Sequence, residues 1–276
     1  ITENSNIKHS GGWTTGVNMA DINSDGLPDI YISKSGSKET ANRQNQLYIN
    51  NGDLSFSEQA AQYHLADNGT TTQTYFFDYD NDGDLDAYLV NHPDDFEKTM
   101  DIYFYVGKAR DSLNSDKLLE NTGAGFVDVT LKAGLWYDKG FGLSASIGDI
   151  NQDGWPDIYV ANDFLEPDYL FINNGDKTFT ESREKYFEKT TLFSMGSDLA
   201  DVDNDGDLDL FVADMEPHEH TRMKSHGFEL PLEFYLMQQE ILNGKQFSRN
   251  MFYLLNDDGT FSEIAELAGV SRTDWS

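Results

Sequence analysis

The sequence predicts an all-β protein, a β-propeller whose blades are four-stranded antiparallel sheets with aspartate-rich calcium loops. First, a nine-residue acidic segment occurs four times in the 276 residues. Second, each copy lies between short runs of strand length and is followed by an Asn-Gly or Asp-Gly type turn, the signature of a β-hairpin. Third, aromatic residues make up 13% of the chain and cysteine is absent. This composition suits sheets packed face to face and stabilised without disulfides.

The repeat period fixes the size of each unit. The acidic segments begin at Asp21, Asp78, Asp149 and Asp201, at separations of 57, 71 and 52 residues. Each unit reads as strand, acidic loop, strand, connection, strand, turn, strand, which is typical of a propeller blade. A β-solenoid would have shorter, parallel repeats, and a sandwich would not explain four near-copies. We expect one domain over residues 1–276, with blades at 12–68, 69–135, 136–190 and 191–272.

Two blades carry insertions. They cover residues 92–117 and 216–249, and the stretch LPLEFYLMQQEILNGK in the second has apolar residues at helical spacing. We expect one short helix there. Insertions in repeat proteins often emerge on the binding face. The aromatic residues Tyr103, Phe104, Tyr105, Phe234 and Tyr235 are therefore candidate contact residues, with packing inside their own insertion as the alternative.

The acidic loops have the chemistry of calcium sites. Calcium takes six to eight oxygen ligands, and acids or amides at loop positions 1, 3, 5 and 9 with a carbonyl at position 7 can surround one ion. Glycine at position 6 permits the sharp turn. The loops are not EF-hands, because strands flank them and no glutamate stands at position 12. Plain solvated turns are the alternative, but four copies with one spacing favour calcium.

The predicted ligands follow from this pattern, one calcium ion per repeat and about four in all. They are Asp21, Asn23, Asp25, the Leu27 carbonyl and Asp29; Asp78, Asp80, Asp82, the Asp84 carbonyl and Asp86; Asp149, Asn151, Asp153, the Trp155 carbonyl and Asp157; and Asp201, Asp203, Asp205, the Asp207 carbonyl and Asp209.

The charge balance excludes some functions. The formal net charge is −30, so the chain repels phosphate backbones and no nucleic-acid partner is expected. No apolar run reaches the length of a membrane span. Four calcium ions would neutralise part of the charge and stabilise the fold in place of disulfides.

Several segments resemble a known repeat family. The stretches ADVDNDGDLDLFVAD, GDINQDGWPDIYVAND and LFINNGDKTF are similar to FG-GAP, or VCBS, repeats, and the closing MFYLLNDDGTFSEIAELAGVSRTDWS is similar to bacterial cell-surface proteins of the cartilage acidic protein type. The resemblance implies a seven- or eight-bladed propeller, of which this chain supplies about four blades. It also implies calcium between the first two strands of each blade, and an extracellular or cell-surface setting on the bacterial outer surface. The FG-GAP signature itself is reduced to Phe141-Gly142, a departure from the integrin α-chain branch.

The sequence therefore favours a binding or scaffold module for a protein or glycan at the cell surface. No catalytic residue is predicted, because cysteine and a GxSxG motif are absent. The alternative is a calcium-dependent polysaccharide lyase or hydrolase, which convergence of Arg, Lys, Tyr and His in one pocket would favour. His218, His220 and His226 allow a zinc site, but polar loop residues are the simpler interpretation. In a propeller, the strands Gly16–Ala20 and Ser194–Ala200 should lie innermost and all four loops should open on one face.

Overall fold

The chain folds into four-stranded sheets grouped in two compact units. A computed structural model describes residues 4–8, 10–36, 39–93, 113–135, 141–164, 167–219, 221–222 and 245–273. One unit contains residues 1–142 with the turn 174–179, and the other contains residues 143–173 and 180–276. Two sheets belong to each unit.

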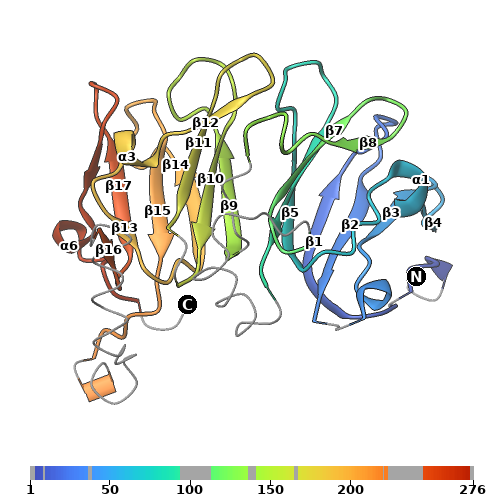
Figure 1. The fold of residues 1–276 in the computed structure, drawn as a ribbon, viewed down its shortest axis with the longest axis horizontal. Coiled ribbons are helices and arrows are strands. Elements are labelled where there is room, and N and C mark those ends of the chain that lie inside the picture. Colours follow the sequence, from blue (N-terminus) through green and yellow to red (C-terminus); the bar gives the residue numbers. More distant parts are fainter. Residues whose placement is uncertain are drawn as a thin grey trace. The chain divides into compact units, whose positions relative to one another are not determined.

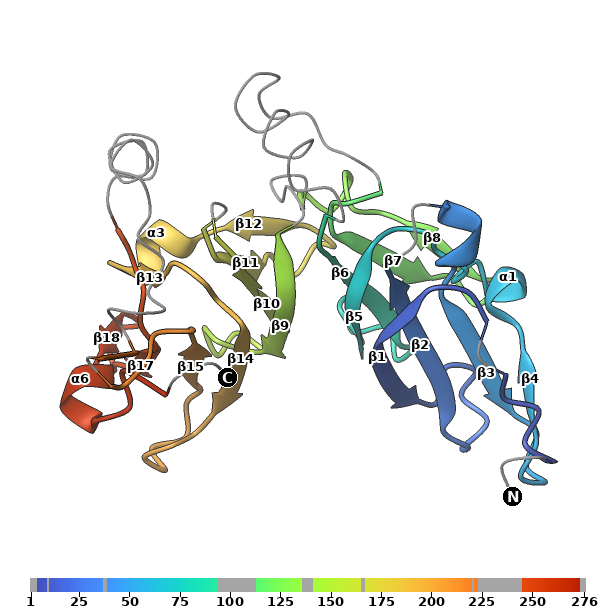
Figure 2. The same ribbon diagram turned by 90° about the horizontal axis from the view of Figure 1, so that it is seen from below.

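The first unit holds two sheets with the strand order of the chain. The first sheet is β1 (Trp13–Ala20), β2 (Asp29–Ser35), β3 (Gln46–Asn50) and β4 (Phe56–Glu58), all antiparallel neighbours. The second sheet is β5 (Thr71–Phe77), β6 (Asp86–Asn91), β7 (Lys117–Asn121) and β8 (Phe126–Asp128). Figure 2 shows β5 lying beside β1, so consecutive sheets are neighbours in this unit.

The second unit repeats the same plan. Its sheets are β9 (Gly142–Gly148), β10 (Asp157–Asn162), β11 (Tyr169–Asn173) and β12 (Phe179–Glu181), then β14 (Gly196–Ala200), β15 (Asp209–Ala213), β17 (Met251–Leu255) and β18 (Phe261–Glu263). Figure 1 shows β14, β15 and β17 side by side. The predicted all-β architecture of four-stranded blades is confirmed, with each acidic loop joining the first strand to the second.

Each unit has an apolar core between its two sheets. In the first unit Tyr31 and Leu47 of one sheet meet Leu89 of the next, and all three are fully buried. In the second unit, Tyr159 of the β9–β12 sheet and Val212 of the β14–β18 sheet are fully buried in one apolar cluster. Side chains alternate between the faces of a strand, so the period-two pattern of the sequence selects these residues for the core.

Some elements were not predicted. One-turn helices follow the last strand of three sheets: α1 (Ala60–Tyr63), α3 (Arg183–Tyr186) and α6 (Ala265–Ala268). A short parallel pair joins β13 (Thr190–Thr191) to β16 (Gln246–Phe247). Helices of one turn leave no periodic pattern to detect, and the paired residues of β13 and β16 are 56 positions apart in the sequence.

Several predictions fall largely outside the described residues. These include the expected helix in LPLEFYLMQQEILNGK, the aromatic residues proposed as contacts (Tyr103, Phe104, Tyr105, Phe234, Tyr235), and His220 and His226. His218 is described and is exposed.

Candidate metal centres

The first aspartate of each acidic loop folds the loop. In the third loop Asp149 Oδ1 accepts the Asp153 N–H at 2.9 Å, and Asp149 Oδ2 accepts the Gly154 N–H at 2.8 Å. The same pair of bonds is made by Asp21, Asp78 and Asp201. The first six residues of each loop are thus wrapped around one carboxylate by local hydrogen bonds.

Two positions of every loop require the left-handed backbone conformation. The predicted glycine at position 6 has φ between 87° and 98° in all four loops. Position 4 is also left-handed, with φ between 56° and 63°, and was not predicted. It is occupied by Ser24, Asn81, Gln152 and Asn204. Asparagine tolerates this region better than most residues, so its presence at two of the four positions was a signal available in the sequence.

The aspartate at position 9 connects its own strand to the acidic loop and to the third strand of the sheet. Asp157 is fully buried; its Oδ2 accepts the Ile150 N–H at 2.9 Å and its Oδ1 accepts the Asn173 N–H of β11 at 2.8 Å. The equivalent pairs of bonds are made by Asp29, Asp86 and Asp209. This residue therefore has a structural role in addition to the ligand role predicted for it.

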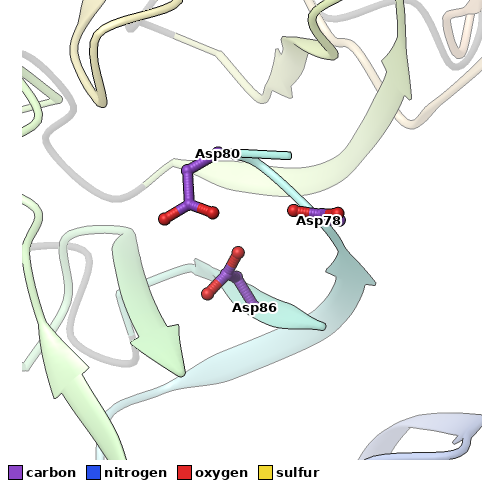
Figure 3. Close-up of side chains that lie close together, drawn as sticks. All are labelled: Asp78, Asp80 and Asp86. Atoms are coloured by element: carbon purple, nitrogen blue, oxygen red, sulfur yellow. The ribbon is translucent and has the colours of Figure 1, made fainter. Parts of the chain in front are cut away.

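Carboxylate oxygens converge in the second and fourth loops. Ligand atoms of Asp78, Asp80 and Asp86 lie within 4.8 Å of one another, and so do those of Asp201, Asp203 and Asp209. Figure 3 shows the carboxylates of Asp80 and Asp86 facing each other, with Asp78 beside them. Two ligands of one calcium ion at about 2.5 Å each can be at most about 5 Å apart, so the spacing fits calcium.

Electrostatic crowding in these loops also fits a cation. Burial, with a smaller contribution from nearby Asp80 and Asp84, raises the pKa of Asp86 to about 7 although two backbone N–H donors act in the opposite direction. Burial and then Asp205 raise the pKa of Asp207 to about 6. The Oδ1 atoms of Asp84 and Asp207 are shielded from water and accept no hydrogen bond. A divalent ion would relieve both the repulsion and the missing interactions.

In the first and third loops an amide replaces one carboxylate. Asn23 Nδ2 donates to Asp25 Oδ2 at 2.9 Å, and Asn151 Nδ2 donates to Asp153 Oδ2 at 2.8 Å. The Oδ1 atoms of Asn23 and Asn151 remain acceptors. These loops offer oxygens in the predicted positions but carry one negative charge less.

A lysine from a distant hairpin reaches the second loop. Lys177 Nζ lies 2.5 Å from Asp80 Oδ2 and 2.8 Å from Glu120 Oε1. These two carboxylates raise the pKa of Lys177 through hydrogen bonds, so the ammonium remains charged. It partly neutralises a predicted calcium ligand and would compete with the ion. Among the residues that the structure describes, no cation pairs with the predicted carboxylate ligands of the fourth loop.

A second set of buried polar residues lies where the third strand of each sheet begins, and sequence analysis missed it. Asp168 Oδ1 accepts the Asn162 N–H at 2.8 Å, and its Oδ2 accepts the Tyr159 hydroxyl at 2.6 Å. Asp116 makes the same two bonds in the second sheet, and Asn45 and Asn250 accept the equivalent N–H in the others. Each stands five residues before the end of its strand, a spacing that the sequence repeats.

This set yields a pH-dependence prediction for Asp168→Asn. Burial raises the pKa of Asp168 to about 7, above about 3.9 in the unfolded chain. Its contribution to stability is therefore fully present below pH 4 and is lost as the pH rises to 7. Asparagine, which occupies the equivalent position in two sheets, keeps the bond from Asn162. We expect wild type to lose about 2–4 kcal/mol relative to the variant across this range, measured by urea unfolding; parallel curves would contradict it.

Ligand charge yields a second prediction. Since charge count tunes calcium affinity, Asn23→Asp should tighten calcium binding at the first loop, and Asp80→Asn should weaken it at the second. We expect changes of about threefold to thirtyfold in Kd, corresponding to about 0.7–2 kcal/mol. Calorimetric titration with calcium measures both. Glu39→Gln, an exposed acid outside the loops, is the matched control; unchanged affinity in both loop variants would refute the charge argument.

The second unit has a polar pocket of about 500 Å³ beside its two acidic loops. Both loops and the β17–β18 turn line it, so the two loops open on the same side of this unit. Its floor includes Ile150, Tyr186 and Leu255, and Lys185 Nζ lies 4.7 Å from the Tyr186 ring centroid. The other lining residues are Asn151, Gln152, Asp205, Asp207, Asn256, Asp257, Asp258, Gly259 and Thr260.

None of the helices described in the structure is both long and apolar enough to cross a membrane.

Parts of this chain are similar to known proteins. A comparison with curated proteins gives no significant match. Among 46 similar chains of solved structures is a lectin of Agrocybe aegerita described as recognising non-reducing terminal N-acetylglucosamine. It is 16% identical, with a TM-score of 0.42, over 89% of this chain and 50% of the lectin chain, so this chain spans half the lectin's length. A family profile described as FG-GAP-like repeat matches residues 35–89 and 149–212, which include three of the four acidic loops. Residues 35–89 and 149–212 of this chain are therefore FG-GAP-like repeats.

Proposed function

We propose that this chain is a calcium-stabilised extracellular binding module that engages a protein or glycan at the cell surface. The observation that carries the proposal is the repetition of one loop geometry four times, with position 1 and position 9 carboxylates held by the same backbone donors. Such preorganised oxygen clusters suit a hard divalent ion. Calcium would hold the loops and support the ligand-binding surface beside them.

The pocket in the second unit supports a polar ligand. Its hydrogen-bonding groups come from Asn151, Gln152, Asn256 and Thr260, while Tyr186 and Leu255 provide apolar surface. Small polar groups around an apolar floor are typical of ligand sites. With Asp205 assigned to calcium, Asp207, Asp257 and Asp258 still outnumber Lys185, the one cation among the described lining residues. The charge would repel uronic acids and sulfated sugars, and we infer a preference for uncharged saccharides or basic peptide groups.

The same pocket bears on the enzyme alternative. A lyase or hydrolase site was expected to gather Arg, Lys, Tyr and His. Among the described residues that line the pocket, only Lys185 and Tyr186 are of these types, so the binding module is the better supported function.

The experiment is a binding screen of the labelled chain on arrays of neutral glycans, polyuronates and basic peptides, with calcium and with chelator. We expect calcium-dependent signals on uncharged glycans or basic peptides and none on polyuronates. Asn256→Ala, in the pocket, should reduce the signal, whereas Asn51→Ala, in the corresponding turn of the first sheet, should not. Strongest binding to polyuronates, or binding unaffected by chelator, would refute the proposal.

A further inference from the structure

The second acidic loop differs from the other three in the surroundings of its position 3. Asp80, at this position, is buried, with a side chain only 1% exposed. Its counterpart in the fourth loop, Asp203, is exposed, and Asn23 and Asn151 in the first and third loops are half-buried and uncharged. A buried carboxylate is costly unless a cation or hydrogen-bond donors accompany it. The second loop is therefore the one that most needs a compensating charge at position 3.

One oxygen of Asp80 is used by the loop itself, and the other meets Lys177. Asp80 Oδ1 accepts the Asp82 N–H at 3.2 Å. Asp80 Oδ2 lies 2.5 Å from Nζ of Lys177, which stands in the turn 174–179 and belongs to the first unit. A calcium ion in this loop would need an Asp80 oxygen that is free to coordinate it. The ammonium therefore pairs with the oxygen that the loop leaves for a metal.

Two further residues form a polar network around the ammonium. Glu120 Oε1 lies 2.8 Å from Lys177 Nζ, and Glu120 Oε2 accepts the Tyr79 hydroxyl at 3.2 Å. Tyr79 stands at position 2 of the loop, and Glu120 precedes the residue that bonds to the position 9 aspartate. In the other three sheets apolar residues occupy these two positions, Ile22, Ile150 and Val202 for the first and Ile49, Ile172 and Leu254 for the second. The network is thus particular to the second repeat.

The turn that carries Lys177 is anchored by other contacts. Phe179 stacks on Tyr79, with ring centroids 6.1 Å apart, and its N–H donates to the Ala133 carbonyl at 2.8 Å. Phe179 and Tyr79 are both buried. Lys177 has a φ of 69°, and Leu54 occupies the same position of the β3–β4 turn with a φ of 67°. The turn geometry therefore does not depend on the lysine side chain, and the ammonium reaches the loop from a fixed backbone.

The second unit has the same arrangement of turn and loop without a lysine. Its β17–β18 turn lies beside the third loop, since both line the polar pocket. The turn position of Lys177 is occupied there by Gly259, which has no side chain. At the third loop, this turn position therefore supplies nothing that could compete with a metal.

We propose that Lys177 is the resident cation of the second loop: in the calcium-free chain its ammonium neutralises Asp80, and calcium binds this loop only by displacing it. The inference rests on the calcium assignment of the proposed function. By linkage, calcium and the Lys177 contact weaken each other by the same factor. The second loop should then keep its structure without calcium and respond only at higher calcium concentrations than the fourth loop. The fourth loop would fill before the second.

Hydrogen–deuterium exchange of the whole chain, read separately at residues 78–86 and 201–209, tests the proposal. In chelator, Lys177→Leu should accelerate exchange of residues 78–86 by about threefold to tenfold, the range expected for a partly exposed ion pair with one buried partner. In a calcium titration, the same variant should lower the calcium midpoint at residues 78–86 by a similar factor, because the competing cation is gone. The midpoint at residues 201–209 should stay unchanged.

Three variants separate the ammonium from the turn that carries it. Lys177→Leu should fold, because Leu54 occupies the same turn position with the same backbone conformation. Lys177→Arg keeps the charge and should retain the slow exchange in chelator. Lys132→Met removes one positive charge from an exposed lysine of the same unit and should change neither measurement.

Unchanged exchange of residues 78–86 in chelator for Lys177→Leu would overturn the proposal, and so would an unchanged calcium midpoint at that segment. A wild-type midpoint at residues 78–86 equal to or below that at residues 201–209 would overturn it without any variant. Failure of the proposed function looks different. Calcium would then alter exchange at neither segment, while Lys177→Leu would still accelerate exchange of residues 78–86 in chelator, an outcome that supports the role of the ammonium and refutes that of calcium.

Discussion

Removal of calcium is expected to lower the melting temperature of the chain by at least about 10 °C. An ion present at 100 times its Kd stabilises the folded state by about 2.7 kcal/mol per site. Two sites in each compact unit would supply about 5 kcal/mol, and 1 kcal/mol corresponds to about 2–4 °C for proteins of this size. Without the ion, the carboxylates clustered around Asp86 and Asp207 repel one another; after burial, neighbouring aspartates are a further cause of the raised pKa of both residues.

Calorimetric melts with excess calcium and with a chelator measure this effect. Magnesium is the control ion, because it is smaller and demands a stricter octahedral geometry, and it should restore less stability than calcium. Identical melts with calcium and with chelator would refute the calcium assignment of all four loops.

Loss of the buried carboxylate at position 9 should have the second large effect. We expect Asp157→Ala to lower the free energy of unfolding by about 2–4 kcal/mol even in chelator. The substitution leaves the N–H groups of Ile150 and Asn173 without their acceptor, and an unsatisfied buried donor costs about 1–3 kcal/mol. Relief of the carboxylate's own burial, which raises the pKa of Asp157 to about 6, offsets part of the loss.

Asp153→Ala is the matched control for Asp157→Ala. Asp153 belongs to the same loop and is a predicted ligand, but it is exposed. Its removal should destabilise the chain with calcium present and have little effect in chelator. Urea unfolding of both variants under both conditions separates the two roles. If Asp157→Ala were also harmless in chelator, position 9 would act only as a ligand and the structural role inferred here would be wrong.

The second and fourth loops should differ in calcium affinity, although their ligands carry the same charge. The second and fourth loops have the same four carboxylates, and sequence analysis treats them alike. Lys177 pairs with Asp80 in the second loop. The fourth loop should therefore bind calcium most tightly.

The sequence by itself determined the blades and the acidic loops, because both are local. A loop such as Asp149–Asp157 closes through bonds from one side chain to backbone groups four and five residues away. Strand alternation and the Asn-Gly type turns are equally short-range signals. The turn at position 6 is also a local property, so the glycine in the sequence was enough to predict it.

Only the tertiary structure decided which residues make contacts beyond those that the repeat pattern indicates. Asp157 bonds to Asn173 across the sheet, and Lys177 reaches Asp80 from 97 residues away in the sequence. Met19 and Phe76 occupy the same repeat position, yet only Met19 is largely exposed. These differences depend on which sheet lies next to which, and packing between sheets is a long-range property that no nine-residue motif contains.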